Sequence, residues 1–265
     1  MTGRILNLGY VKDASVDNYD PDEPYGLISA NDSSIKPDPE MVATGVDIGL
    51  MRLHIHNAPE RRRFLGLLPD RSYEIMVTFA SVHIHQRSDG DRDVMKVKYS
   101  KFFNIDKEDS AGGFTYKKMF QGLKFKRSLS LDVKLTEIDN NVVDPDPLAS
   151  LLEDTGIGTV LDLAPYNPKE YIMLASNIVS KIQEVFGSDK AGDDPLWEDS
   201  LVLEPKPTIP GSYRLREGFY AIIEEYPGFD FGEIVYQNNA LYWRETHDEI
   251  PANYLVFSVG KSIPV

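Results

Sequence analysis

Residues 128–138 alternate apolar and polar side chains with a strict period of two. Leu129, Leu131, Val133 and Leu135 fall on one set of positions, and Ser130, Asp132, Lys134 and Thr136 fall on the other. Because successive side chains of a strand point to opposite faces, this pattern predicts an amphipathic strand with one face in a core.

Similar β-type runs, bounded by turn-forming residues, occur along most of the chain. The predicted strands are residues 4–10, 25–30, 46–56, 72–86, 94–105, 114–120, 201–203, 213–225, 233–237, 240–243 and 253–259. Ser88–Asp91 predicts a hairpin turn, and Asn238–Asn239 predicts a second one. The chain should therefore be mainly β.

One long helix is expected at residues 168–186, with Asn167 as N-cap, Pro168 at the first helical position and Gly187 after the last turn. Its apolar residues form one stripe, so it should pack on a sheet. The expected fold is a mainly β, antiparallel β-sandwich with this helix over residues 1–204. Prolines between 205 and 210 precede a C-terminal β segment, 205–265, which belongs to the same domain or forms a separate one.

Acidic loops follow two of the predicted strands. Asp17, Asp20 and Asp22 lead into Glu23-Pro24-Tyr25, and the alternating strand leads into Asp139, Asn140, Asn141, Asp144 and Asp146. In residues 4–30 and 128–146 the sequence resembles the C2 family of β-sandwich domains, although Glu23 stands where that family usually has Asp. The resemblance implies two loops that gather oxygen ligands around calcium. The residues expected to bind calcium are Asp17, Asp22, Asp139 and Asp144. The alternative is an ordinary solvated loop in an acidic protein.

Two His-x-His pairs, His54 with His56 and His83 with His85, lie inside predicted strands. Residues i and i+2 share a face, so each pair could present two imidazoles to one transition metal. The first pair, with Gly49, Glu60 and Gly66, also resembles the opening motif of the cupin family. Alternatively, the pattern around Leu53 and Ile55 places His54 and His56 on a polar, solvated face.

The formal net charge is -14, from 42 acidic and 28 basic side chains, so nucleic acid is an unfavourable general partner. Basic residues nevertheless concentrate in one segment, which also contains Lys101. The predicted patch for an anionic partner consists of Lys96, Lys98, Lys117, Lys118, Lys124, Lys126 and Arg127. The alternative is a set of solvated strand faces.

The absence of cysteine excludes disulfides and thiolate sites, and no apolar run approaches the roughly 18 residues of a membrane span. These features predict a cytoplasmic protein. No nucleophile elbow, phosphate-binding loop or zinc-protease helix is present in the sequence. We therefore expect a non-catalytic binding or scaffold module for a protein partner or anionic surface. The alternatives are a metal-dependent enzyme that uses the histidines, with Glu60 as ligand or base, and a structural subunit of a larger assembly.

Overall fold

The computed structural model describes residues 6–56, 72–86, 92–106, 117–137, 194–207 and 212–263. Strands dominate this part of the chain, as the alternating patterns predict. In chain order the elements are β1 (Leu6–Val11), β2 (Tyr25–Ser29), α1 (Met41–Thr44), β3 (Val46–His54), β4 (Ser72–Gln86), β5 (Arg92–Asp106), β6 (Lys117–Leu123), β7 (Leu129–Glu137), β8 (Asp194–Glu204), β9 (Tyr213–Arg214), β10 (Gly218–Glu224), the 3-10 turn η1 (Phe231–Glu233), β11 (Ile234–Gln237), β12 (Ala240–Trp243) and β13 (Tyr254–Lys261).

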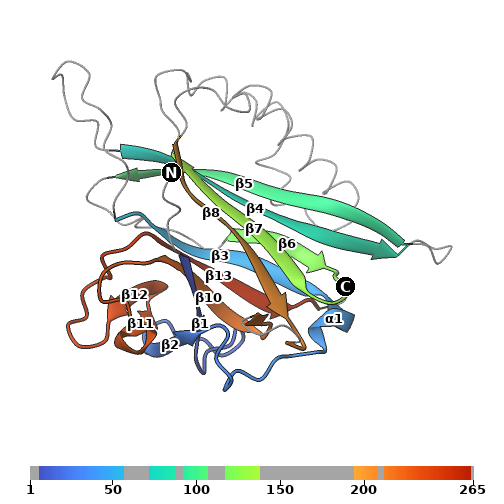
Figure 1. Ribbon diagram of the computed structural model, residues 1–265, viewed down its shortest axis with the longest axis horizontal. Coiled ribbons are helices and arrows are strands. Elements are labelled where there is room, and N and C mark those ends of the chain that lie inside the picture. Colours follow the sequence, from blue (N-terminus) through green and yellow to red (C-terminus); the bar gives the residue numbers. More distant parts are fainter. Residues whose placement is uncertain are drawn as a thin grey trace, which may run out of the picture.

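The strands form two sheets that pack face to face (Figure 1). The main sheet has the order β12-β11-β2-β1-β10-β13-β3-β6, and the second sheet has the order β5-β4-β7-β8-β9. All pairings are antiparallel except that of β8 with β9. The mainly β, antiparallel part of the predicted fold is thus confirmed.

The core between the sheets follows the period of two. Leu129, Leu131, Val133 and Leu135 of β7 are all fully buried there. They meet apolar residues of the main sheet that include Tyr220, Ile222, Leu255 and Phe257. Their polar neighbours Ser130, Asp132 and Lys134 remain partly exposed, so the strongest pattern in the sequence identifies the inner face of the second sheet.

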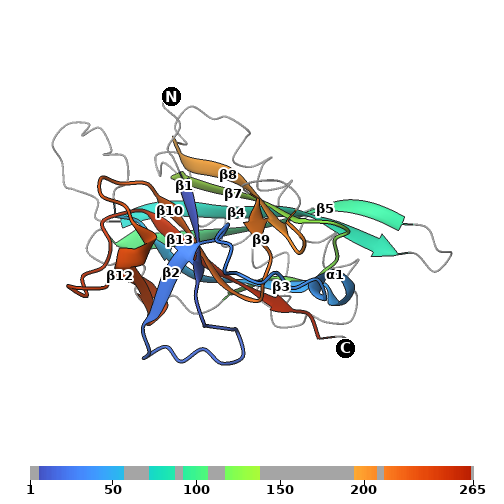
Figure 2. The ribbon, with the colours of Figure 1, turned by 60° about the horizontal axis from the view of Figure 1, so that its bottom comes forward.

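The central strands of the main sheet are buried on both faces. Ala221 lies between Tyr220 and Ile222 on β10, and Val256 lies between Leu255 and Phe257 on β13. Both belong to a second core, which also contains Leu27, Ile234 and Leu241. Strands β2, β11 and β12 therefore curl over the far face of the sheet to which they belong (Figure 2). Burial on both faces explains why β10 and β13 are continuous apolar runs rather than alternating ones.

Strands of the C-terminal segment lie within the main sheet: β10 and β13 lie between β1 and β3. The β11–β12 hairpin turns at Asn238 and Asn239, whose φ angles are 51° and 61°. Two left-handed residues characterise the tight hairpin turn that this Asn pair predicts. The helix expected at residues 168–186 lies outside the described residues. Within the described residues, the helical elements are α1 and η1.

Candidate functional site

Two charged regions of the described chain bring ionisable side chains together. The first, the buried ionic cluster, consists of Arg52, His54, Glu249 and Tyr254. The second, the edge lysines, consists of Lys98 and Lys101 on β5 and Lys117 on β6. Each contains residues that the sequence pattern nominated, but their surroundings differ.

The buried ionic cluster centres on the Glu249 carboxylate. Its Oε1 atom lies 3.3 Å from the Arg52 Nη2 atom and 3.0 Å from the His54 Nδ1 atom, and it accepts a hydrogen bond from the Tyr254 hydroxyl. Burial alone would raise the pKa of Glu249, but the contacts with His54, Tyr254 and Arg52 together lower that pKa to about 2. Glu249 is therefore held as a carboxylate.

The prediction that His54 lies on a solvated face is wrong. His54 is only 7 % exposed, and its ring stacks on Tyr254 with 4.8 Å between the ring centroids. The reason is the second core, which covers the face of β3 that the alternation marks as polar. His56 is exposed, and its ring centroid lies 6.4 Å from that of His54.

The second histidine pair lies on a different sheet. His83 is buried on β4, and its Nδ1 atom accepts a hydrogen bond from the Lys124 backbone N–H at 3.2 Å. His85 is paired with Asp93 across β4 and β5, and its side chain and Glu60 lie outside what the structure describes. Within the described residues no three His, Asp or Glu side chains form a metal-binding group. The transition-metal site stays a prediction.

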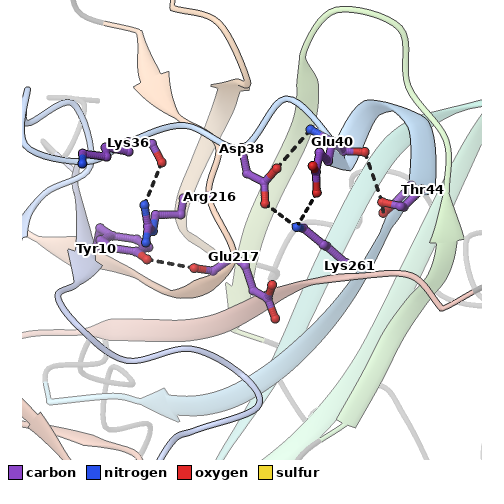
Figure 3. Close-up of polar contacts among 9 residues, drawn as sticks. Tyr10, Lys36, Asp38, Glu40, Thr44, Arg216, Glu217 and Lys261 are labelled. Carbon is purple, nitrogen blue, oxygen red and sulfur yellow. Dashed lines mark hydrogen bonds and ion pairs between the residues drawn. The ribbon is translucent and has the colours of Figure 1, made fainter.

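The first acidic loop divides its contacts between two neighbours. Its later part lies on the Asn238–Asn239 turn, where Gln237 Nε2 donates to the Asp22 carbonyl oxygen at 2.6 Å. Asp17 lies near Glu217 instead, and the pKa of Glu217 is raised by burial first and by Asp17 next. Beside Glu217, Lys261 Nζ lies 2.8 Å from Asp38 and 3.1 Å from Glu40, so these two acids share one lysine (Figure 3).

Asp139 and Asp144, the other two predicted calcium ligands, lie outside the described residues. The last described residue before them, Glu137, is paired with Asp194 at the start of β8. Figures 1 and 2 both place the start of β8 on the opposite side of the molecule from the loop that follows β1. The calcium site and the resemblance to C2 domains stay predictions.

The predicted basic patch separates into paired and unpaired residues. Lys118 forms an ion pair with Asp47 at 3.2 Å, and Lys124 Nζ donates to the Ala43 and Thr44 carbonyl oxygens at the end of α1. Lys96 lies 3.7 Å from Asp132. Lys126 and Arg127 are exposed in the turn that follows β6. These residues therefore have structural or solvated positions.

The edge lysines, in contrast, have no acidic partner within ion-pair distance among the described residues. Burial lowers the pKa of Lys98, and Lys96 and Lys134 lower it further. Burial also lowers the pKa of Lys101, and Lys117 adds to that shift from the neighbouring sheet. Lys101 Nζ additionally lies 5.7 Å from the centre of the Phe103 ring. Each of these two half-buried lysines thus lies near other positive charges.

Lys101 and Lys117 come together because β5 and β6 are both edge strands, one in each sheet, whereas Lys98 lies near Lys96 and Lys134. The sequence shows that lysines are frequent here, but it does not show which of them have acidic neighbours. Glu249 and Tyr254 were missed entirely, because an acid five residues before a Tyr in the last strand is not a motif.

No protein-family model, curated protein or solved structure matches this chain. The part of the chain that the structure describes contains no helix of the length and apolar character that crossing a membrane requires.

Proposed function

We propose that this protein is a non-catalytic binding module whose edge lysines contact an acidic protein partner. The observation that carries the proposal is the placement of Lys98, Lys101 and Lys117 beside other lysines in a chain of net charge -14. With 42 acidic residues, the chain has ample means to neutralise three cations. Acids form ion pairs with Lys118 and Lys261. No described acid forms an ion pair with any of the three edge lysines.

Unpaired cations that are half-buried cost free energy, because burial disfavours the charged form and like charges repel. An acidic partner would remove that cost by pairing with them, and oppositely charged surfaces also accelerate association. A protein partner suits this geometry better than a flat anionic surface, since Lys101 and Lys117 come from two different sheets and converge at one side of the molecule.

The test uses a fluorescent decaglutamate peptide, with binding measured by fluorescence anisotropy. The triple variant Lys98→Ala, Lys101→Ala, Lys117→Ala should bind at least about tenfold more weakly than the parent protein, because each lost charge pair contributes to affinity. The matched control is Lys12→Ala, Lys36→Ala, Lys206→Ala, which removes the same charge from three exposed positions elsewhere.

The control variant should bind within about twofold of the parent protein, and added salt should weaken all binding. Equal losses in both triple variants would reduce the effect to net charge and overturn the proposal. Failure of the parent protein to bind the peptide at low salt would overturn it as well.

A further inference from the structure

The outer edge of β5, which no other described strand pairs with, is unusually long. All fifteen residues of β5 are paired with β4, from Ser72↔Asp106 to Gln86↔Arg92, without a register shift. Within the described residues no strand is paired with the other side of β5. Strands of globular proteins typically have about 5–6 residues, and exposed edges are usually kept short or covered because they can pair with another chain.

The β4–β5 ribbon also extends past its neighbours. Strand β7 is paired with β4 only from Ile75 to Ser81. Residues 82–86 therefore continue beyond β7, and Figures 1 and 2 both show the end of the ribbon projecting from the rest of the described elements. An extended segment could approach the β5 edge there without meeting another described strand.

One hydrogen bond identifies which β5 residues present their backbone groups at this edge. The Ile84 N–H donates to the Lys124 carbonyl oxygen at 2.9 Å, so it is not used to bond β5. Ile84 and Val94 therefore form a non-hydrogen-bonded pair. Hydrogen-bonded and non-hydrogen-bonded pairs alternate, so Lys96, Lys98 and Ser100 also direct their N–H and C=O groups away from β4.

The charge of the edge determines what could pair with it. Lys96 and Lys98 lie on the outer face of β5, and Lys101 lies on the face that packs toward the core, near Lys117. A strand added beside β5 would thus have lysines near it on both faces. Lysines on an edge strand discourage pairing with uncharged or basic strands, but they favour a strand that carries Asp or Glu.

The geometry points to strand addition: the outer edge of β5 pairs with an acidic, extended segment of the partner protein. This inference rests on the proposed function and adds the conformation of the partner and the backbone contacts that hold it. The side chains of the edge lysines select acidic residues, while the N–H and C=O groups of Lys96, Lys98 and Ser100 supply the affinity of a β ladder.

The experiment uses an eight-residue peptide of alternating Glu and Val, and a matched peptide with two central prolines that cannot complete a ladder. Ser100→Pro removes an edge N–H without changing charge, and an edge position tolerates proline. It should weaken binding of the alternating peptide about tenfold. Ser100→Ala is the matched control, since it removes only the hydroxyl contact with Thr78, and should bind within about twofold of the parent protein.

Hydrogen exchange of the unmodified protein tests the same inference without a substitution. Addition of the alternating peptide should slow exchange at the amides of Lys96, Lys98 and Ser100 more than at those of Val97 and Tyr99, which point toward β4. The proline-containing peptide should not produce this alternation.

The outcomes separate the two proposals. Unchanged binding in Ser100→Pro, together with no alternating protection, would overturn strand addition. If the triple lysine variant still lost binding in that case, the edge lysines would remain the contact surface and the proposed function would stand. If the lysine variant bound like the parent protein, the proposed function itself would fall.

Discussion

The buried ionic cluster and the edge lysines treat charge in opposite ways. In the cluster, the single carboxylate of Glu249 contacts Arg52, His54 and Tyr254 in the covered far face of the main sheet. At the edge, three lysines from two sheets lie near other lysines. No acid among the described residues forms an ion pair with them. One region joins opposite charges, whereas the other holds like charges together.

The difference indicates what each region contributes. Glu249 belongs to the loop between β12 and β13, and its contacts connect that loop to β3, so the cluster ties together elements far apart in sequence. The edge lysines connect nothing within the described chain, and their repulsion opposes folding. We therefore infer that the cluster serves stability and that the edge lysines serve binding, and the predictions below test that division.

The largest effect is expected from Glu249→Gln. The substitution keeps the size of the side chain but removes the charge that Arg52 and His54 contact, so the free energy of unfolding should fall by about 2 kcal/mol or more. Urea denaturation measures the change. The control is Asp248→Asn, a neighbouring exposed position, which should change stability by less than about 0.5 kcal/mol. Equal stability of Glu249→Gln and the parent protein would contradict the inference that the buried ionic cluster serves stability.

An acid titration sharpens the same side. The pKa of Glu249 is lowered from 4.5 to about 2. Its carboxylate therefore stabilises the folded state at pH values above the ordinary pKa of 4.5. That contribution should be lost as the pH falls from about 4.5 toward 2. The stability difference between the parent protein and Glu249→Gln should therefore be largest above about pH 5 and shrink through this range. A difference that stays constant with pH would show that the carboxylate charge is not responsible.

The sequence predicts the strands well because burial on one face leaves a period of two. Residues 72–86 are predicted as a strand, and β4 has those bounds. The same rule fails at His54, because both faces of β3 are covered and a polar position of the pattern is buried by the second core. Alternation reveals which residues share a face, but not how many layers cover the strand.

The candidate sites were less predictable, because ion pairs depend on residues far apart in the chain. Lys98, Lys118 and Lys124 look equivalent in sequence, yet Asp47 and the end of α1 bind the latter two. Glu249 is 197 residues from Arg52. Such contacts follow from sheet order, which strand patterns do not encode.

The smallest effects are expected from Lys117→Ala. The directions in which it changes stability and binding distinguish the edge lysines from the buried ionic cluster. Removing Lys117 should raise the pKa of Lys101 toward its ordinary value of 10.5 without reaching it, because burial, the larger cause of the shift, remains. Nuclear magnetic resonance of the Lys101 side chain measures this change. A lowered lysine pKa makes stability rise with pH in the range just below 10.5, so that rise should become smaller in the variant.

At neutral pH the same substitution should increase stability by up to about 0.5 kcal/mol, since one like-charge contact is relieved. It should also weaken binding of the acidic peptides. A partner-binding surface requires that stability rises while binding weakens, because the charge that repels other lysines in the free protein attracts acidic residues across the interface. If stability and binding fell together, Lys117 would act as the buried cluster does, and the contrast between the two regions would disappear.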